Sequence, residues 1–322
     1  MINIIHSECL EYLKNIDDNY FDTIITDPPY GIKFKNNKWD YSVPSIKYFK
    51  EFLRVIKPGG SILCFGGSRT FHRMMINMED AGWFIKDTLM WFHNQGFPKS
   101  VDISYMIDKN RNKSGSKKNS YVVSDNIMSS KEISLNKEII INNPYDDKSK
   151  AWFGWGTNLK PSYEPIILAS KPIIGNYDDN ALNYGVCGYW IDGVRVENTK
   201  NYGISRTTNG RWPTNILKDE SCINSFDKNN RFHFCSKPTK KEKREYNTHP
   251  TVKPIDLMRY LCRLTKTPTG GIILDPFCGS GTTGIGALIE ERSAILIDSS
   301  IESVNIAKKR ISEYNKNINE IF

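Results

Sequence analysis

The first hundred residues alternate between short apolar runs and segments with helical spacing. The β-branched run that ends at Asp27 is followed by Pro28 and Pro29, and a short run of this kind is typical of a buried parallel strand. The pattern predicts a strand over 22–27, a helix over 46–56 ended by Pro58, a strand over 61–65, a helix over 70–81 and an aromatic strand over 83–92. This succession is a βαβ pattern.

The last seventy residues return to the same pattern. Leucines at helical spacing after Pro254 predict a helix, and Ser299 with Glu302 forms a capping-box pattern before the final helix. The predicted elements are a helix over 254–264, a strand over 271–275, a glycine-rich turn, a helix carrying Ile285, Leu288 and Ile289, a strand over 294–298, and a final helix with Val304, Ala307 and Ile311 inward.

Composition divides the middle of the chain. Residues 109–150 are rich in Lys, Asn and Ser and hold nine basic and five acidic residues, which indicates an inserted, partly flexible segment. The pattern resumes over 151–171, with a strand-like run at 165–169, and is lost again over 172–246. We therefore expect a first α/β half at 1–108, an insert at 109–150, a core strand within 151–171, a region of separate composition at 172–246, and a second half-sheet at 247–322.

Charge adds a partner class to this picture. The 322 residues carry a net charge of +8, and the segments 109–150 and 231–245 contribute +4 each, so the rest of the chain is close to neutral. A polyanionic partner is therefore expected. Seven scattered cysteines without a CxxC pair argue against a disulfide framework and favour a reducing compartment such as the cytoplasm. Neither a signal peptide nor a membrane span is expected.

The turn at 279–284 has the sequence GxGxxG, and Asp298 follows Gly279 by nineteen residues. These are features of a dinucleotide site, but only 24 residues follow Asp298, so the remaining strands must come from the N-terminal half in a permuted sheet. A Walker loop is disfavoured because no Gly-Lys-Ser/Thr follows. A nucleoside-type ligand and a purely structural turn remain as interpretations.

The tetrapeptide at 27–30 combines a carboxylate, two prolines and a tyrosine at the carboxyl end of the first strand. The prolines lock the backbone and leave the Pro28 carbonyl without a ladder partner beside Asp27, while Tyr30 offers a flat ring. Two acceptors and a ring suit a flat aromatic ligand with an amino group. A plain strand-terminating turn is the alternative.

Together these blocks resemble the S-adenosylmethionine-dependent DNA amino-methyltransferases of the permuted order called the β group. Residues 27–30 look like the catalytic motif, 275–283 like the cofactor motif and 249–254 like the helix-opening motif that precedes it. Segments 96–100, 154–161 and 210–215 are more loosely similar to phage and prophage methylases. The resemblance implies an α/β fold with a circularly permuted, Rossmann-like sheet, helices on both faces and an inserted target-recognition region.

The resemblance also implies the site residues. The catalytic residues would be Asp27, Pro28, Pro29 and Tyr30. The residues that would bind S-adenosylmethionine are Glu8, Cys9, Asp27, His249, Thr251, Lys253, Pro254, Asp275, Pro276, Phe277, Gly279, Ser280, Gly281, Thr282, Thr283 and Asp298. The sequence departs from the family in two places: Ser7-Glu8 replaces the usual Gly-Asp, and Ser300 and Ser303 stand where an acid and a tyrosine often follow the ribose acid.

The implied reaction moves a methyl group to the exocyclic amine of a flipped base, with Tyr30 stacking on the base while Asp27 and the Pro28 carbonyl accept the amine protons. The family association of Asp-Pro-Pro-Tyr favours adenine N6, with cytosine N4 as the alternative. Phe34, Trp39 and Phe92 could add a second stacking face or belong to the core. An RNA or nucleotide methyltransferase and a catalytically idle DNA-binding protein are the rival functions.

Double-stranded DNA is the expected partner, and a homodimer and a cognate restriction endonuclease are left open. Target recognition is expected in 172–246 with help from 109–150. The residues expected to contact DNA are Lys99, Arg211, Arg231, Lys237, Lys240 and Lys241. No metal is expected, because the spacing of Cys222, His233, Cys235 and His249 matches no common zinc site.

Overall fold

The computed structural model describes residues 1–33, 37–93, 100–111, 117–120, 139–142, 144–196, 210–219, 232–235 and 238–319. The chain forms two compact units: Met1–Asn94 with Ser162–Phe322, and Gln95–Pro161. No helix within these described ranges is long and apolar enough to cross a membrane. The six described cysteines are all free thiols.

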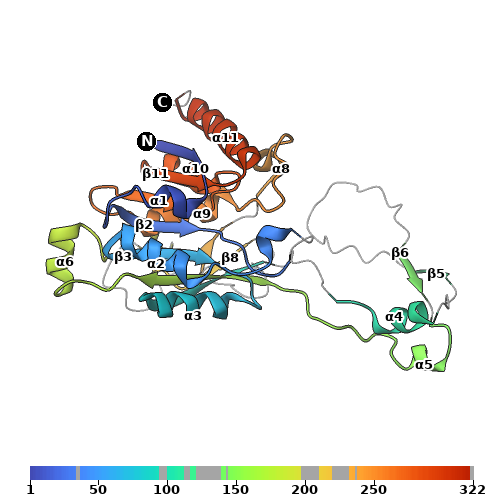
Figure 1. Ribbon diagram of the computed structural model, residues 1–322. Coiled ribbons are helices and arrows are strands. Elements are labelled where there is room, and N and C mark those ends of the chain that lie inside the picture. The colour runs from blue at the N-terminus through green and yellow to red at the C-terminus, as the bar shows by residue number, and fades with distance from the viewer. Residues whose placement is uncertain are drawn as a thin grey trace. The chain divides into compact units, whose positions relative to one another are not determined.

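A nine-stranded sheet forms the centre of the first unit (Figure 1). In spatial order its strands are β1 (Ile2–His6), β11 (Ser293–Asp298), β10 (Ile272–Asp275), β2 (Phe21–Thr26), β3 (Ile56–Phe65), β7 (Tyr163–Ser170), β4 (Phe84–Phe92), β8 (Ile216–Lys218) and β9 (His233–Phe234). The first five are parallel to one another, β7 is antiparallel to both its neighbours, and β8 and β9 run parallel to β4. Because β1 pairs with β11 and β2 with β10, the permuted sheet expected from the sequence is confirmed.

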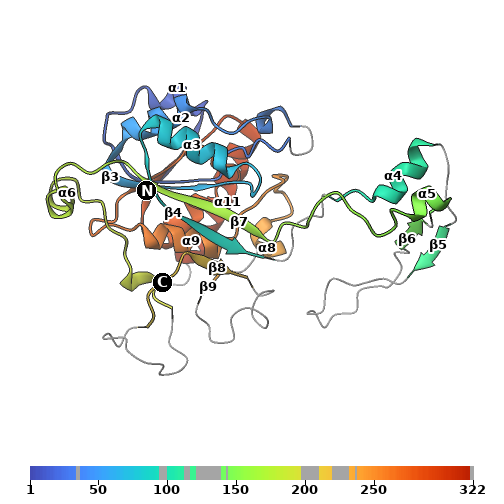
Figure 2. The same ribbon diagram turned by 90° about the horizontal axis from the view of Figure 1, so that it is seen from below.

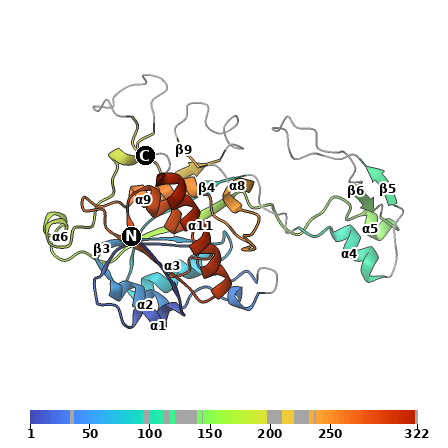
Figure 3. The ribbon, with the colours of Figure 1, turned by 90° about the horizontal axis from the view of Figure 1, so that it is seen from above.

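Helices cover both faces of this sheet (Figures 2 and 3). One face packs against α1 (Cys9–Leu13), α2 (Ile46–Val55) and α3 (Phe71–Ala81), and the other against α9 (Ile255–Leu264), α10 (Thr282–Ile289) and α11 (Ile301–Asn319). Successive strand residues point to opposite faces, so Ile24 belongs to the first core and Ile25 to the second. Both faces are apolar, which explains the continuous apolar runs of the parallel strands.

Strand β3 begins earlier than its sequence predicted. The helix expected over 46–56 ends at Val55, and Pro58 and the two glycines lie inside the strand. Gly59 N donates to Lys171 O and Lys171 N donates to Gly60 O, so the glycines continue the pairing with the chain that follows β7. Their missing side chains make room for Asn180, whose amide would lie 2.5 Å from a Cβ at Gly59.

Residues 172–246 contain elements that the sequence did not predict. They are α6 (Tyr177–Tyr184), the 3-10 helix η3 (Asp192–Val194), β8, β9 and α8 (Lys240–Lys243). The helix α6 begins at Asn176, whose side chain accepts from Asp179 N, and only Asn180 of the helix is buried. Strands of two or three residues and a largely exposed helix carry too little apolar periodicity to be recognised.

The capping box predicted at Ser299 and Glu302 is wrong. The Ser300 hydroxyl accepts from Ser303 N at the start of α11, and Glu302 accepts a hydrogen bond from the Thr248 hydroxyl instead. The inward positions Val304, Ala307 and Ile311 are buried as predicted.

The second unit, Gln95–Pro161, contains the expected insert 109–150 and extends beyond it at both ends. It holds α4 (Ile103–Asn110), the antiparallel pair β5 (Lys117–Ser120) and β6 (Ile139–Asn142), and α5 (Asp147–Lys150). Arg111 and Asp146 form an ion pair at 2.6 Å that joins the end of α4 to the start of α5.

Candidate active site

Two strand ends form the centre of the candidate site. Strands β2 and β10 are parallel neighbours, so the tetrapeptide after β2 and the glycine turn after β10 emerge at the same edge of the sheet. The Thr26 hydroxyl donates to Asp275 Oδ1 at 2.9 Å and links the two ends directly. Segments about 250 residues apart thereby meet at one edge, as the sequence predicted.

The glycine turn holds three of the predicted cofactor residues together. Gly279 has a positive φ of 50°, its N–H donates to Asp298 Oδ2 at 2.9 Å, and a Cβ at this position would lie 2.9 Å from His249 Nε2. The His249 ring is fixed in turn by Nδ1, which lies 3.0 Å from Thr251 O. Only glycine allows the backbone, the imidazole and the acid at the end of β11 to approach this closely.

Asp275 is used inside the fold. Its buried carboxylate accepts from the Thr26 and Thr283 hydroxyls and from Phe277 N at 3.2 Å. Burial raises the pKa of Asp275 to about 7, although these hydrogen bonds oppose the shift. Asp275 and Thr283 therefore shape the turn between β10 and α10.

Arg310 of α11 fixes the other side of the turn. Its guanidinium is buried and donates to Ser280 O at 2.6 Å, to the Ser280 hydroxyl and to the Thr282 hydroxyl. It also donates to Glu242 O of α8 at 3.2 Å. No sequence pattern indicated the role of this arginine, because a single basic residue in a helix is usually solvent-exposed.

Glu8 lies at the end of β1. Its carboxylate caps α1 through Glu11 N at 3.1 Å and accepts from the Tyr48 hydroxyl, whose pKa is raised to about 12 by burial and by Glu8. The Tyr48 ring packs on Phe277 with centroids 6.0 Å apart. Cys9 is a buried thiol whose pKa is raised, first by burial and then by Glu8, so it is a space-filling neighbour of this acid.

The tetrapeptide after β2 lies in a charged cluster. Lys253 Nζ lies 3.0 Å from Asp27 Oδ2, 2.8 Å from Glu164 Oε2 and 3.0 Å from the Tyr30 hydroxyl. The Tyr30 hydroxyl donates to Asp27 Oδ1 at 2.6 Å. His93 Nε2 lies 3.7 Å from Glu164 Oε1, an ion-pair distance that is too long for a hydrogen bond.

Charge states in this cluster follow from its contacts. Burial opposes the charged form of Lys253, but Asp27 and Glu164 outweigh burial and raise its pKa. Burial likewise opposes the charged form of Glu164, yet Lys253 and His93 lower its pKa to about 2. Burial first, then the two carboxylates, raise the pKa of Tyr30. The cluster therefore holds an ammonium group, charged Glu164 and a neutral phenol at neutral pH.

Asp40 holds the backbone of the tetrapeptide. Its Oδ1 accepts from Tyr30 N at 2.7 Å and from Gly31 N at 2.9 Å, and the side chain is buried. Among the described residues, none donates a hydrogen bond to the Pro28 carbonyl oxygen. Pro28 directly follows Asp27 in the chain, so its carbonyl is a second hydrogen-bond acceptor at the carboxyl end of β2.

A family model described as DNA methylase, N6_N4_Mtase, matches residues 21–309. The chain belongs to this family. It is 24% identical over 352 residues to the Type II methyltransferase M.HindIII of Haemophilus influenzae, covering 96% of this chain and 94% of M.HindIII. Its fold is similar to that of the M1.HpyAVI–SAM complex, with 20% sequence identity, a TM-score of 0.51, and coverage of 97% of this chain and 99% of that chain. It is also similar to PvuII DNA methyltransferase, described as cytosine-N4-specific, with 16% sequence identity, a TM-score of 0.53, and coverage of 99% of this chain and 93% of that chain. The protein is therefore an S-adenosylmethionine-dependent DNA amino-methyltransferase.

The residues at the glycine turn fit S-adenosylmethionine. The methylase places a close backbone approach at Gly279, an acid after each of the neighbouring strands β1 and β11 (Glu8 and Asp298) and the ring of His249 along one edge of the sheet. Carboxylates suit ribose hydroxyls and an adenine amine, and a side-chain-free turn lets a nucleoside approach the backbone. Pro254 opens α9, and Pro276 and Phe277 lie in the turn that follows β10.

Four residues at the site were not expected from the sequence: Glu164, His93, Asp40 and Tyr48. Glu164 and His93 lie in segments 70 residues apart and meet only because β7 and β4 pair in one register, Trp91 beside Glu164. A charged residue at the start of an otherwise apolar strand was the available signal for Glu164. Asp40 had no local pattern, since an acid that binds backbone N–H groups is common in loops.

Most residues expected to contact DNA or to stack are not placed in this site. Lys99, Arg231, Lys237 and Phe34, and the side chains of Lys240 and Lys241, lie outside the described residues. Arg211 pairs through its backbone with Val196, next to a Trp212 ring that faces Arg195 at 5.3 Å. Trp39 is 53% exposed, and the Phe92 ring contacts Tyr163.

The residues weighed as zinc ligands have other surroundings. Cys222 lies outside the described residues, and Cys235 is buried. His233 packs on the Tyr260 ring at 4.2 Å, and burial lowers its pKa to about 4. Among the described side chains, no three of the metal-binding types form a group that could hold an ion.

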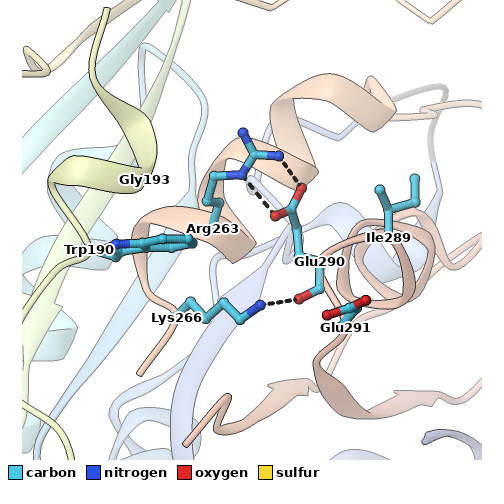
Figure 4. A pocket seen from close by; sticks show the side chains of 7 residues that line it. All are labelled: Trp190, Gly193, Arg263, Lys266, Ile289, Glu290 and Glu291. Atoms are coloured by element: carbon cyan, nitrogen blue, oxygen red, sulfur yellow. Dashed lines mark hydrogen bonds and ion pairs between the residues drawn. The ribbon is translucent and has the colours of Figure 1, made fainter. Parts of the chain in front are cut away.

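A cavity of about 250 Å³ lies at the other end of α10, away from the glycine turn (Figure 4). Trp190, Arg263, Lys266 and Glu290 line it. Arg263 pairs with Glu290 at 2.7 Å, and Lys266 donates to Glu290 O at 2.9 Å. Arg263 and Lys266, the basic residues that line the cavity, are thus both bound to Glu290. The lining includes no residue of the active site, so the cavity is separate from it.

Proposed function

We propose that the methylase methylates the N6 amine of an adenine that is flipped out of double-stranded DNA. The observation that carries the proposal is the Asp27 carboxylate at the end of β2, held by the Tyr30 hydroxyl at 2.6 Å and followed directly in the chain by the Pro28 carbonyl. An adenine amine inside a duplex is not accessible to such a site, so the base has to leave the stack.

In the proposed reaction S-adenosylmethionine supplies an electrophilic methyl group. Asp27 and the Pro28 carbonyl accept hydrogen bonds from the two amine N–H groups, which orients the nitrogen lone pair and draws it out of conjugation with the ring. The nitrogen gains the methyl group and loses one proton through Asp27 to solvent, keeps its other N–H, and S-adenosylhomocysteine would be the second product. The Tyr30 ring stacks on the base while its hydroxyl stays on Asp27. Glu8, His249, Gly279 and Asp298 are the residues that we propose to hold the nucleoside part.

Nucleoside mass spectrometry of duplex DNA treated with the methylase and S-adenosylmethionine tests the base. We expect N6-methyladenine. Cytosine N4 is the second candidate, because the methylase shares its fold with the cytosine-N4-specific PvuII enzyme and cytosine carries an equivalent amine. N4-methylcytosine as the sole product would replace the adenine assignment.

The partners are proposed on two grounds. The basic segments 109–150 and 231–245 suit a DNA backbone contacted by residues such as Lys99, Arg211, Arg231, Lys237, Lys240 and Lys241. M.HindIII is named a Type II methyltransferase, so we infer a restriction-modification role in the cytoplasm with a cognate endonuclease. Cleavage protection of methylated host DNA tests that role, and sedimentation of the free protein tests the homodimer.

A further inference from the structure

The charged cluster contains one more carboxylate than its lysine needs. Lys253 is 11% exposed, and an ion pair with Asp27 alone would already neutralise its buried ammonium group. Glu164 brings a second negative charge to 2.8 Å from the same nitrogen. Removing a carboxylate from water costs free energy, so a surplus charged acid at a strand end indicates a function.

Strand direction explains how Glu164 reaches this edge. Strand β7 is antiparallel to β3 and β4, so its first residues lie beside the last residues of those strands: Trp91 pairs with Glu164 and Phe65 with Ile166. An acid at the beginning of β7 therefore lies at the carboxyl edge of the parallel strands, where Asp27 follows β2. His93, which follows β4, flanks it at 3.7 Å.

We propose that Glu164 is a positioning residue of the methylase that acts through Lys253 to set the orientation of the Asp27 carboxylate. The inference rests on the proposed role of Asp27 as acceptor of the amine protons. Lys253 holds Asp27 Oδ2 at 3.0 Å, and the Tyr30 hydroxyl holds Oδ1 at 2.6 Å, so both oxygens are fixed. Glu164 fixes Lys253 itself, and it lies 3.4 Å from the Tyr30 hydroxyl.

Sharing the ammonium group has a second effect. A lysine paired with Asp27 alone would neutralise the charge of the Asp27 carboxylate and weaken that carboxylate as a hydrogen-bond acceptor. Because Lys253 is shared by two acids, negative charge remains on Asp27. The free lone pairs of the Asp27 oxygens then remain strong acceptors for the amine protons. Glu164 thereby contributes both orientation and charge through its contact with Lys253.

Steady-state methyl transfer by Glu164→Gln tests the proposal. The assay counts all methyl groups transferred per enzyme molecule, whichever base receives them. We expect kcat to fall about 10-fold to 100-fold, because a small misplacement of an acceptor has effects of this size. The KM values for DNA and for S-adenosylmethionine should stay within about threefold. Glu164→Ala should lose more, since glutamine still offers Lys253 an oxygen.

Glu290→Gln is the matched control. Glu290 is a buried acid that pairs with Arg263 of α9 outside the site, so its substitution should lower the melting temperature and leave kcat unchanged. An unchanged kcat in Glu164→Gln, or an equal loss of kcat in both variants, would overturn the proposal. A product of N4-methylcytosine would overturn the adenine assignment and leave this inference standing.

A double-mutant cycle with Lys253→Gln separates positioning from a structural role. If Glu164 acts through Lys253, the kcat of the double variant equals that of the less active single variant. The variants are first shown to be folded by circular dichroism and thermal melting. If the fold-losses in kcat of the two single variants then multiply in the double variant, Glu164 does not act through Lys253.

Discussion

Among the described side chains, Asp27 contacts Tyr30 and Lys253, and Lys253 also contacts a second acid, Glu164. When Asp27 is removed, Lys253 keeps Glu164 at 2.8 Å, so the buried ammonium group does not become unpaired. The fold and the glycine turn should therefore survive the loss of the acceptor. This separates a chemical defect from a folding defect.

We expect Asp27→Ala to abolish methyl transfer while S-adenosylmethionine binding changes by no more than about threefold. Isothermal titration calorimetry and a methyl-transfer assay measure the two effects. Asp18→Ala is the matched control, because Asp18 is a surface partner of Arg54. Parallel loss of binding and transfer would be incompatible with the role assigned to Asp27.

The raised pKa of Asp275 should make the stability of the fold depend on pH. Its pKa of about 7 lies above the value of 3.8 for an exposed aspartate, so between these values the folded state binds more protons than the unfolded state. Folding stability contributed by this group therefore falls as pH rises from about 4 to about 7. Asp275→Asn removes the titration.

The free energy of unfolding of the methylase, relative to that of Asp275→Asn, should decrease over this window by up to about 4 kcal/mol. Urea unfolding at pH values from 4.5 to 8 measures the difference. Parallel stability profiles of the two proteins would show that Asp275 is charged throughout.

Helices α9 and α10 pack closely at Gly286. A Cβ there would lie 2.9 Å from the carbonyl carbon of Met258 and 3.0 Å from Arg259 N, both backbone atoms that cannot move without shifting α9. Gly286→Ala, which would stabilise an isolated helix by about 1 kcal/mol, should here destabilise the fold by about 1–3 kcal/mol.

Thermal unfolding compares Gly286→Ala with Gly188→Ala. A Cβ at Gly188 meets nothing within 4 Å, so the same substitution there should be neutral or slightly stabilising. Equal melting temperatures for both variants would show that α9 and α10 can separate at no cost.

The strongly periodic elements were predictable from the sequence. Strands β2, β10 and β11 and helices α9 and α10 appear where apolar spacing placed them, because each buries its apolar residues against the sheet. The strand start at Ile56 was missed, because Pro58 and two glycines usually end a strand and here border Asn180. Short β8 and β9 owe their conformation to pairing beside β4, which no local pattern encodes.

The same distinction holds for the active site. Asp27, Tyr30 and Gly279 lie in contiguous motifs and could be identified one block at a time. The contacts of Glu164 and Arg310 depend on strand register and helix packing, so they required the folded chain. Lys253 was expected beside the cofactor, and its observed partners are Asp27, Tyr30 and Glu164.

Charge is unevenly distributed over the whole molecule. The segments 109–150 and 231–245 carry the entire net charge of +8, and the methyltransferase sheet and its helices are close to neutral. Binding to a polyanion through such segments releases condensed counterions, whereas binding a small nucleoside at the sheet edge does not.

DNA affinity should therefore fall by about a thousandfold between 50 and 200 mM salt if about six phosphates are contacted. The affinity for S-adenosylmethionine should change by less than about twofold. Fluorescence anisotropy of labelled duplex DNA and calorimetry of cofactor binding measure the two responses. A flat salt response for DNA would argue against backbone contacts by the basic segments.

The permuted strand order also determines when the protein can fold on the ribosome. Ile24 of β2 pairs with Leu274 of β10, and Ile2 of β1 with Ala294 of β11, so the early strands wait for partners about 250 to 290 residues later. At elongation rates of about 5 to 20 residues per second this takes about 10 to 60 s. Until β10 is synthesised, β2 lacks one of the two strands with which it pairs in the folded protein. Completion of β10 supplies the partner of β2, and the active site is complete only when β11 brings Asp298 to Gly279 and α11 brings Arg310 to Ser280.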